Sequence, residues 1–189
     1  MPFATSRFSF TSDLTAEVIP ELPRLGLTLP RILATIGVYG WTLETFLDAL
    51  RVAQVASVLD VRQRRGVRGR EYAWANARRL EAALAEAGIG YRHHRELAPT
   101  TELRQLQYRE DDRVDVGKRS RTELAPEYRE RYLGEILDPL DLTPLVAELQ
   151  AEGAAALLCV ERDPEACHRS LVAERLSAEF GLQVVHLRP

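Results

Sequence analysis

Twelve residues near the carboxyl end of the chain bring together groups that can do chemistry. The stretch CVERDPEACHRS, from Cys159 to Ser170, holds both cysteines of the protein, one of its four histidines, two arginines and three carboxylates. Thiolate and imidazole groups bind zinc, a thiol beside an imidazole can act as a nucleophile, and arginine binds phosphate or carboxylate. The stretch is therefore compatible with a metal centre, a reactive thiol, an anion site or simply a polar turn.

As a zinc site the stretch is incomplete. Cys159, Cys167 and His168 offer three ligands, but the spacing lacks a paired C-x-x-C, and a fourth ligand would have to come from elsewhere. Small buried thiols are also common in protein cores. We therefore expect no stoichiometric metal, with a zinc-stabilised structural domain as an alternative.

A catalytic thiol is a further alternative. Cys167 lies near the start of a predicted helix and next to His168, and both features would lower its pKa. Adjacent helical residues point about 100° apart, so these two side chains are not expected to face each other well. Cys159, at the end of a predicted strand, is the other candidate nucleophile.

The pattern along the chain predicts strands and helices in alternation. Continuous apolar runs predict buried strands, and apolar residues three and four apart predict helices; Asp163 is expected to cap the last of these helices and Gly181 to close it. The strands are expected at 32–36, 56–62, 89–97, 154–161 and 182–187, and the helices at 42–55, 72–88, 125–137, 142–153 and 163–181.

This order predicts the fold class. Strands that are apolar throughout are typical of a parallel sheet covered on both faces. We expect a single α/β domain over residues 32–189, with a mostly parallel sheet flanked by helices in Rossmann-like layering. Residues 1–31 are interpreted as an N-terminal extension. The charged segment 98–123 is interpreted as a long excursion that covers or flanks another part of the domain.

The topology predicts where a site would form. Ligands of open parallel sheets bind beyond the carboxyl ends of the strands, so polar residues that follow different strands should meet there. Arginines at this edge suit a small anionic or nucleotide-like ligand, and carboxylates can act as bases, although the same groups could form a purely structural ion-pair network. The candidates for catalysis are Asp60, Glu161, Cys167 and His168, and those for ligand binding are Tyr39, Arg62 and Arg169.

Arg169 carries the most specific expectation. With Pro164 as the first helical residue, Arg169 falls on the inward side of the predicted helix, near the edge of the sheet. An arginine on a buried row rarely lacks a partner. We expect its guanidinium to point into the crevice and to pair with a carboxylate or an anionic ligand.

A second cationic region follows the second predicted strand. The loop 62–70 reads RQRRGVRGR and is followed by Tyr72 and Trp74, which suits contact with a nucleic-acid backbone and stacking of bases. A solvated loop is the commoner reason for such a charge run. The rival function is a nucleic-acid-binding module without catalysis, and its arginines would be Arg62, Arg64, Arg65, Arg68 and Arg70.

The composition sets limits on these alternatives. With 46% hydrophobic and 28% charged residues, the 189-residue chain is typical of a globular protein, and its net charge of -3 argues against a generally basic nucleic-acid binder. The sequence lacks a signal-peptide layout and any apolar run of transmembrane length. We expect a cytoplasmic protein without membrane partners, and no motif indicates a particular cofactor or oligomeric state.

Several segments together resemble a known family. TIGVYG, TLETFLDAL, VLDVR, LEAALAEAGIGYRHHRELA, YRERYLGEIL and LLCVERDPEACHRSLVAERL are similar to the domain of unknown function 488 family, over roughly residues 33–187. The resemblance implies an α/β fold but no settled activity. The family's first motif usually reads TIGHS, whereas Val38 and Tyr39 stand here in place of its histidine and serine. QRRGVRG likewise replaces the proline and serine that commonly follow DVR, so a mechanism that needs the first histidine is not expected.

Overall fold

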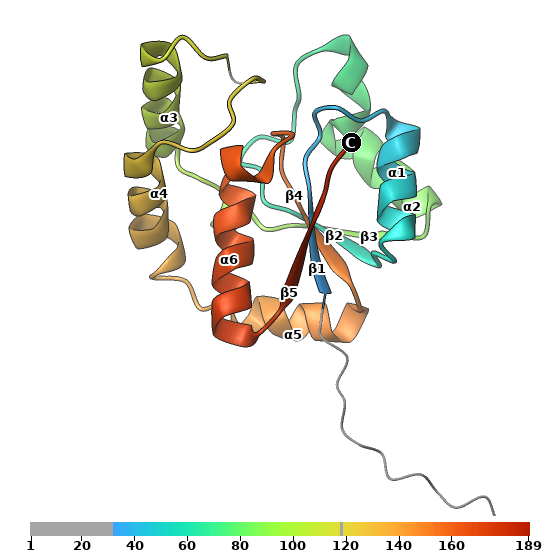
Figure 1. Cartoon of the computed structure of the whole chain (residues 1–189). Helices are drawn as coiled ribbons and strands as arrows, with labels where there is room; N and C mark the ends of the chain where they lie inside the picture. The colour runs from blue at the N-terminus through green and yellow to red at the C-terminus, as the bar shows by residue number, and fades with distance from the viewer. Residues whose placement is uncertain (1–31, 118) are drawn as a thin grey trace, which may run out of the picture.

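A five-stranded parallel sheet forms the centre of the computed structural model (Figure 1). The structure describes residues 32–117 and 119–189, apart from the side chains of 150–152, so the predicted extension 1–31 lies outside it. The strand order is β3-β2-β4-β1-β5, and every neighbouring pair is parallel. The strands are β1 (Ile32–Ile36), β2 (Ser57–Asp60), β3 (Gly90–His93), β4 (Ala155–Leu158) and β5 (Gln183–Leu187).

Helices cover both faces of the sheet, which confirms the predicted α/β class. Two pack on one face, three on the other, and α5 lies at the end where the strands begin (Figure 1). In the described residues, no helix has the length and apolar character needed to cross a membrane. The helices are α1 (Leu43–Val52) and α2 (Ala77–Glu86) on the first face, α3 (Thr101–Arg113), α4 (Pro126–Tyr132) and α6 (His168–Phe180) on the second, and α5 (Thr143–Glu152).

The core divides into two clusters because successive strand residues point to opposite faces. Leu33 and Leu157 pack with the residues of α4 and α6, whereas Ala34 and Leu158 pack with those of α1 and α2. All four side chains are at most 1% exposed. The apolar runs that predicted the strands therefore record burial on both faces of the sheet.

The strand order creates a crevice beside β4. This strand lies between β1 and β2, and the chain leaves β1 and β2 toward the face that α1 and α2 cover. From β4 the chain turns instead toward α6 on the opposite face. Such divergence of neighbouring connections opens the crevice in which α/β proteins bind ligands.

The predicted helix 72–88 is wrong at its start. A short 3₁₀ helix (Arg70–Ala75) comes first, Asn76 is extended with φ −70° and ψ 140°, and only then does α2 begin. The Asn76 side chain accepts a hydrogen bond from the Val67 amide at 2.7 Å. This contact ties the basic loop to the start of α2, so the helix cannot begin earlier.

The predicted helix 163–181 is also interrupted. Pro164–Ala166 form one 3₁₀ turn, Cys167 is extended with φ −142° and ψ 139°, and α6 begins at His168. Cys167 is therefore the residue that precedes the helix, not a member of its first or second turn, and Asp163 caps only the short turn without a side-chain hydrogen bond. The 100° separation expected between Cys167 and His168 does not apply, because the two residues do not share a helix.

The charged excursion 98–123 contains the thirteen-residue helix α3, which the sequence interpretation missed. Thr100 caps it, accepting a hydrogen bond from the Leu103 amide at 3.2 Å. The buried side chains Leu103, Leu106 and Gln107 recur at helical spacing. The remaining short elements are the turns Arg95–Leu97 and Leu133–Leu137, the second being a wider π-helical turn that continues α4.

Candidate functional site

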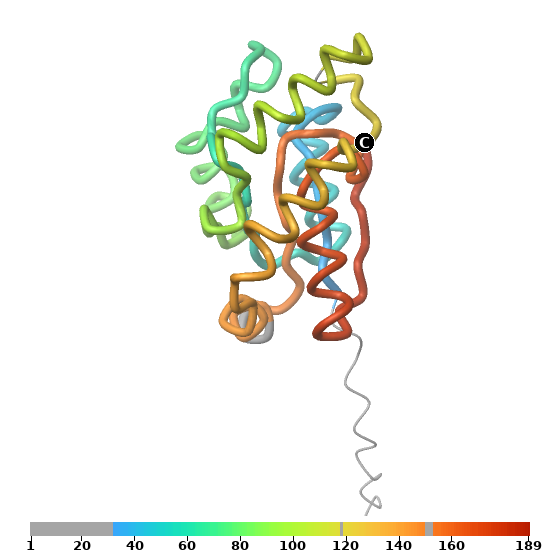
Figure 2. Tube along the Cα trace, turned by 90° about the vertical axis from the view of Figure 1, so that its left-hand side faces the viewer, coloured from blue at the N-terminus to red at the C-terminus, as the bar shows by residue number. Residues whose placement is uncertain are grey.

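A cavity of about 490 Å³ lies beyond the carboxyl ends of the strands. Its walls come from the loop after β2, from α3 and from the loop after β4, with Tyr39 added from the loop after β1. The loop after β2 and α3 both rise beyond the strand ends in the two views of Figures 1 and 2. The cavity thus occupies the crevice that the strand order creates, and its volume is in the usual range for small-molecule sites.

The charged groups at the end of β2 satisfy one another. The Asp60 carboxylate is fully buried, and it accepts hydrogen bonds from Arg62 Nη2 at 2.6 Å and from the Tyr91 hydroxyl at 2.5 Å. Arg62 Nη1 donates to the Ala75 carbonyl at 2.9 Å. Arg62 borders the cavity, but Asp60 does not. This closed arrangement favours a structural ion pair over the base expected at Asp60.

The loop after β4 is held tightly against β1. A Cβ atom on Gly37 would come within 1.8 Å of the Glu161 carbonyl oxygen, so only glycine fits there. The amides of Val38 and Tyr39 both donate to the Val160 carbonyl at 3.0 Å. These contacts fix the backbone that carries Cys159 and Glu161 at the floor of the cavity.

Arg169 supports this loop from behind. Its side chain is buried on the sheet side of α6, where Nη1 donates to the Glu161 carbonyl at 2.7 Å and Nη2 to the Arg162 carbonyl at 2.9 Å. Arg169 is not among the residues that line the cavity. The expected pairing with a carboxylate or a ligand is replaced by main-chain carbonyl partners, because the loop folds over the guanidinium.

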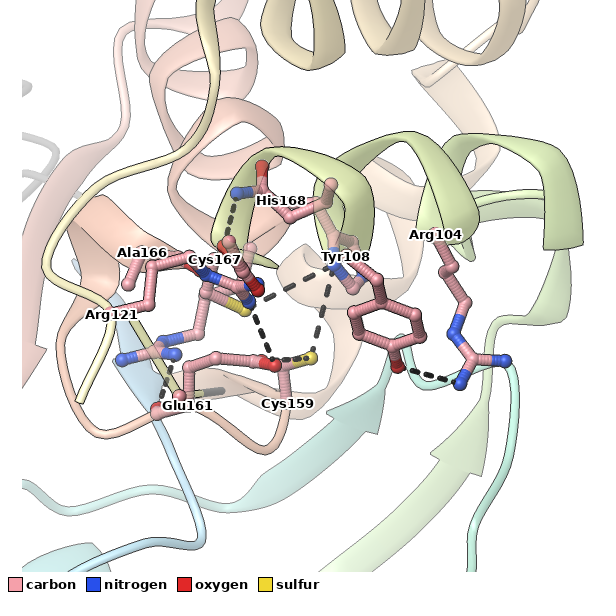
Figure 3. A network of polar contacts seen from close by, with 12 residues as sticks. Arg104, Tyr108, Arg121, Cys159, Glu161, Ala166, Cys167 and His168 are labelled. Carbon is pink, nitrogen blue, oxygen red and sulfur yellow. Dashed lines mark hydrogen bonds and ion pairs between the residues drawn. The ribbon is translucent and has the colours of Figure 1, made fainter. Parts of the chain in front are cut away.

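Two thiols and an imidazole converge on the cavity floor (Figure 3). His168 Nδ1 lies 3.8 Å from Cys159 Sγ and 3.9 Å from Cys167 Sγ. His168 Nε2 lies 3.0 Å from the Val61 carbonyl. A carbonyl oxygen can only accept, so Nε2 carries a proton and Nδ1 faces the two sulfur atoms. The structure therefore brings Cys167 and His168, which the assumed helical geometry had kept apart, into one group with Cys159.

The two thiols differ in their electrostatic surroundings. Burial raises the pKa of Cys159, and the neighbouring Cys167 and Glu161 raise it further. Burial acts in the same sense on Cys167, but a hydrogen bond from Cys159 and the positive charges of Arg169 and His168 outweigh it and lower its pKa well below the ordinary thiol value. Burial lowers the pKa of His168, whereas Cys167 raises it, and the net change is upward.

Glu161 is the one carboxylate among the described residues that line the cavity. Its Oε1 atom lies 3.2 Å from Arg121 Nη2, and its Oε2 atom lies 3.5 Å from Cys159 Sγ (Figure 3). Arg121 also donates to Asp111 at 2.7 Å and to the Ala166 carbonyl at 3.3 Å. A buried arginine therefore joins the segment after α3 to the floor of the cavity.

Among the cavity residues that were not predicted from the sequence are the polar side chains Arg104, Tyr108 and Arg121. Arg104 Nη2 donates to the Tyr108 hydroxyl at 2.9 Å (Figure 3), and Arg104 Nη1 donates to the Gln63 side chain at 2.6 Å. All three come from the excursion that was interpreted without a helix. The signal that could have found them is Thr100 followed by Leu103 and Leu106, which is the start of a helix with one inward face.

The arginines of the basic loop separate into two groups. Arg62 and Arg65 have acidic partners, Asp60 and Glu81 respectively. Arg64 and Arg68 border the cavity, are exposed, and have no acidic partner within the described part of the chain. Arg70 is exposed as well but lies outside the cavity lining.

Tyr39 forms the far wall of the cavity, as expected for a residue that follows β1. Its ring centroid lies 5.0 Å from that of Tyr72, and the Arg119 guanidinium lies 5.2 Å from the Tyr39 centroid. Trp74 packs on Phe46 in the core at 5.0 Å and is not in the cavity lining. Of the two aromatic residues considered for base stacking, Trp74 is therefore half-buried against the core and lies outside the cavity.

Together these features describe a parallel α/β protein with a cavity at the carboxyl ends of its strands. The family described as Domain of unknown function DUF488 matches residues 42–176, which is well over half of the chain. The protein belongs to this family, as the CVERDPEACHR stretch predicted. Comparison with curated proteins and with solved structures found no match.

Proposed function

We propose that the cavity binds a small anionic ligand of nucleotide-like size. The observation that carries the proposal is an excess of arginine: five arginines border the cavity against one carboxylate, in the part of the chain that the structure describes. Two of the five are neutralised by acidic partners. The three for which the described residues provide no acidic partner are Arg64, Arg68 and Arg104.

Arg104 is the best placed of the three to bind an anion. Its side chain is half-buried, and it is held by two neutral partners, the Gln63 amide oxygen and the Tyr108 hydroxyl. These contacts orient the guanidinium without cancelling its charge, so it stays able to bind a phosphate or carboxylate through charge-assisted hydrogen bonds. Arg64 and Arg68 would add charge from the loop after β2.

Aromatic residues at the cavity suit a ligand that carries a flat ring as well as an anionic group. Tyr39, Tyr108 and Tyr128 all border the cavity, and the half-buried Tyr108 offers a ring on which a base or another flat ring can pack. The ligand would lie above Cys167, His168 and Glu161, which supports a role in acting on the ligand as well as binding it. Asp60 and Arg169 have no direct part in this proposal, because their partners are protein groups.

Calorimetric titration with inorganic phosphate and adenosine monophosphate tests the proposal. We expect Arg104→Gln to weaken binding by about tenfold or more, because a hydrogen bond to a charged group contributes about 1.5–3 kcal/mol. Arg109→Gln is the matched control, since Arg109 is an exposed arginine on the same helix outside the cavity lining. Equal affinities for the two variants, or no binding by the unaltered protein, would contradict the proposal.

The same experiment addresses the nucleic-acid alternative. A short single-stranded oligonucleotide replaces the small ligand, and the loop variant Arg64→Gln, Arg68→Gln, Arg70→Gln is compared with Arg104→Gln. If the loop binds a phosphate backbone, the triple change should reduce the salt dependence of oligonucleotide affinity by about 0.7 in log–log slope for each phosphate that the loop no longer neutralises. Tight oligonucleotide binding that depends on the loop but not on Arg104 would favour that alternative.

A further inference from the structure

The cavity floor has the features of a metal site that the anion proposal does not use. Cys159, Cys167 and His168 are the one group of three possible metal ligands found among the described residues, and their ligand atoms all lie within 4.8 Å of one another. They come from the end of β4 and from the start of α6, eight residues apart in the sequence. We propose that this cluster binds zinc through two thiolates and one imidazole.

The distances fit a tetrahedral ion. With zinc about 2.3 Å from sulfur and about 2.0 Å from nitrogen, tetrahedral angles place those ligand atoms about 3.5 Å apart. His168 Nδ1 lies 3.8 Å from one sulfur and 3.9 Å from the other. These separations are long for hydrogen bonds to a thiol. The two sulfur atoms lie within 4.8 Å of each other, whereas tetrahedral angles at zinc place them about 3.8 Å apart, so coordination requires the ligand atoms to move together by at most about 1 Å.

The orientation of the histidine supports the same conclusion. Zinc-binding histidines donate their other ring N–H to a carbonyl or a carboxylate, which fixes the ring and the coordinating nitrogen. His168 does this through Nε2, which lies 3.0 Å from the Val61 carbonyl at the end of β2. The backbone of Cys159 is equally fixed, because its amide donates to the Ile36 carbonyl at 3.1 Å. The ligands are thus positioned in advance by β2 and β1, the two strands that flank β4.

The fourth coordination position would face the cavity. All three ligand residues are at most 6% exposed to solvent, yet all three line the cavity. Structural zinc sites have four protein ligands, whereas catalytic sites have three and leave one position for water or substrate. Glu161 lies beside the cluster but is paired with Arg121. We therefore place it near the open coordination position and do not count it as a zinc ligand.

This inference reverses the expectation of a metal-free protein. That expectation rested on three ligands close in the sequence and on a missing fourth, but an open site needs only three. Soft thiolate and imidazole ligands select zinc over magnesium or calcium. A zinc ion at this place would lie next to the proposed anion, although zinc binding does not depend on that proposal.

Metal analysis of the purified full-length protein is the first test. We expect about one zinc per chain, lost in Cys167→Ser and in His168→Gln but retained in Glu161→Gln. Because buried substitutions can prevent folding, unaltered protein stripped with a chelator provides a second measurement. Added zinc should raise its unfolding temperature and protect Cys167 from alkylation by iodoacetamide. Stripped protein that neither binds zinc nor gains protection would overturn the inference.

Cobalt substitution tests the open position. Tetrahedral cobalt bound by thiolates gives intense visible bands and a near-ultraviolet charge-transfer band, both of which should be missing in Cys167→Ser. Inorganic phosphate should change the visible bands if the fourth position faces the anion site. Tetrahedral bands that phosphate leaves unchanged, in protein that binds phosphate by calorimetry, would show a closed structural site and reject the open position. Phosphate binding that is independent of metal would support the anion proposal alone.

Discussion

The ends of β2 and β4 lie side by side in the sheet and use buried polar residues in opposite ways. At the end of β2, Asp60, Arg62 and Tyr91 complete one another's hydrogen bonds. At the end of β4, the sulfur atoms and the imidazole nitrogen meet at distances too long for strong hydrogen bonds, and they face a cavity. Burial and position in the fold therefore do not by themselves identify functional residues. Polar side chains that face a cavity with incomplete hydrogen bonding are better candidates.

The largest expected effect on stability comes from breaking the Asp60–Arg62 ion pair at the end of β2. Asp60→Asn leaves the Arg62 guanidinium, which is 2% exposed, without its counter-charge. We expect a loss of about 3–5 kcal/mol in the free energy of unfolding, as is usual when one partner of a buried ion pair is removed. Urea unfolding at neutral pH measures it. The double variant Asp60→Asn, Arg62→Met should lose less, and a single variant within about 1 kcal/mol of the unaltered protein would show that the pair is not structural.

A smaller effect is expected behind the β4 loop. Arg169→Lys keeps the charge but cannot reach both the Glu161 and Arg162 carbonyls, so we expect a loss of about 2–3 kcal/mol in the free energy of unfolding. Arg175→Lys, on the outer part of the same helix, is the control and should stay within about 0.5 kcal/mol. Phosphate affinity should be unchanged in both. A stable Arg169→Lys protein that no longer binds phosphate would restore the original expectation of a ligand-binding arginine.

The smallest expected effect is a pH-dependent change in stability at the end of β2. Burial raises the pKa of Tyr91 to about 12, with the hydrogen bond to Arg65 opposing the rise and that to Asp60 adding to it. We expect Tyr91→Phe to lower the free energy of unfolding by about 1–2 kcal/mol at pH 7. The difference should hold up to the ordinary tyrosine pKa of about 10 and shrink between pH 10 and 12, because the unfolded chain ionises first. A difference that grows with pH would contradict this description.

The sheet was predictable from the sequence for a clear reason. The central strands β1, β2 and β4 are buried on both faces almost throughout, so their apolar runs are continuous, whereas the edge strands β3 and β5 are partly exposed. Gly153 and Gly181 end helices where the backbone needs positive φ values of 94° and 68°. The edge at which Asp60 and Glu161 meet followed from the parallel topology alone. The polar helix α3 escaped prediction because its few inward residues are separated by charged ones.

The sequence by itself determined the fold class, the family and the edge of the sheet at which the polar residues gather. Only the tertiary structure decided which of them pair. Asp60 pairs with Arg62 and Tyr91, and Arg169 donates to two carbonyl groups. The reason is that a buried charge binds whichever partner the surrounding chain brings within reach. The break in the helix at Cys167, where the backbone is extended, turned two residues expected to point apart into neighbours of one sulfur–nitrogen cluster. Spacing along a chain defines directions only within a regular element, and this cluster lies where one such element ends and another begins.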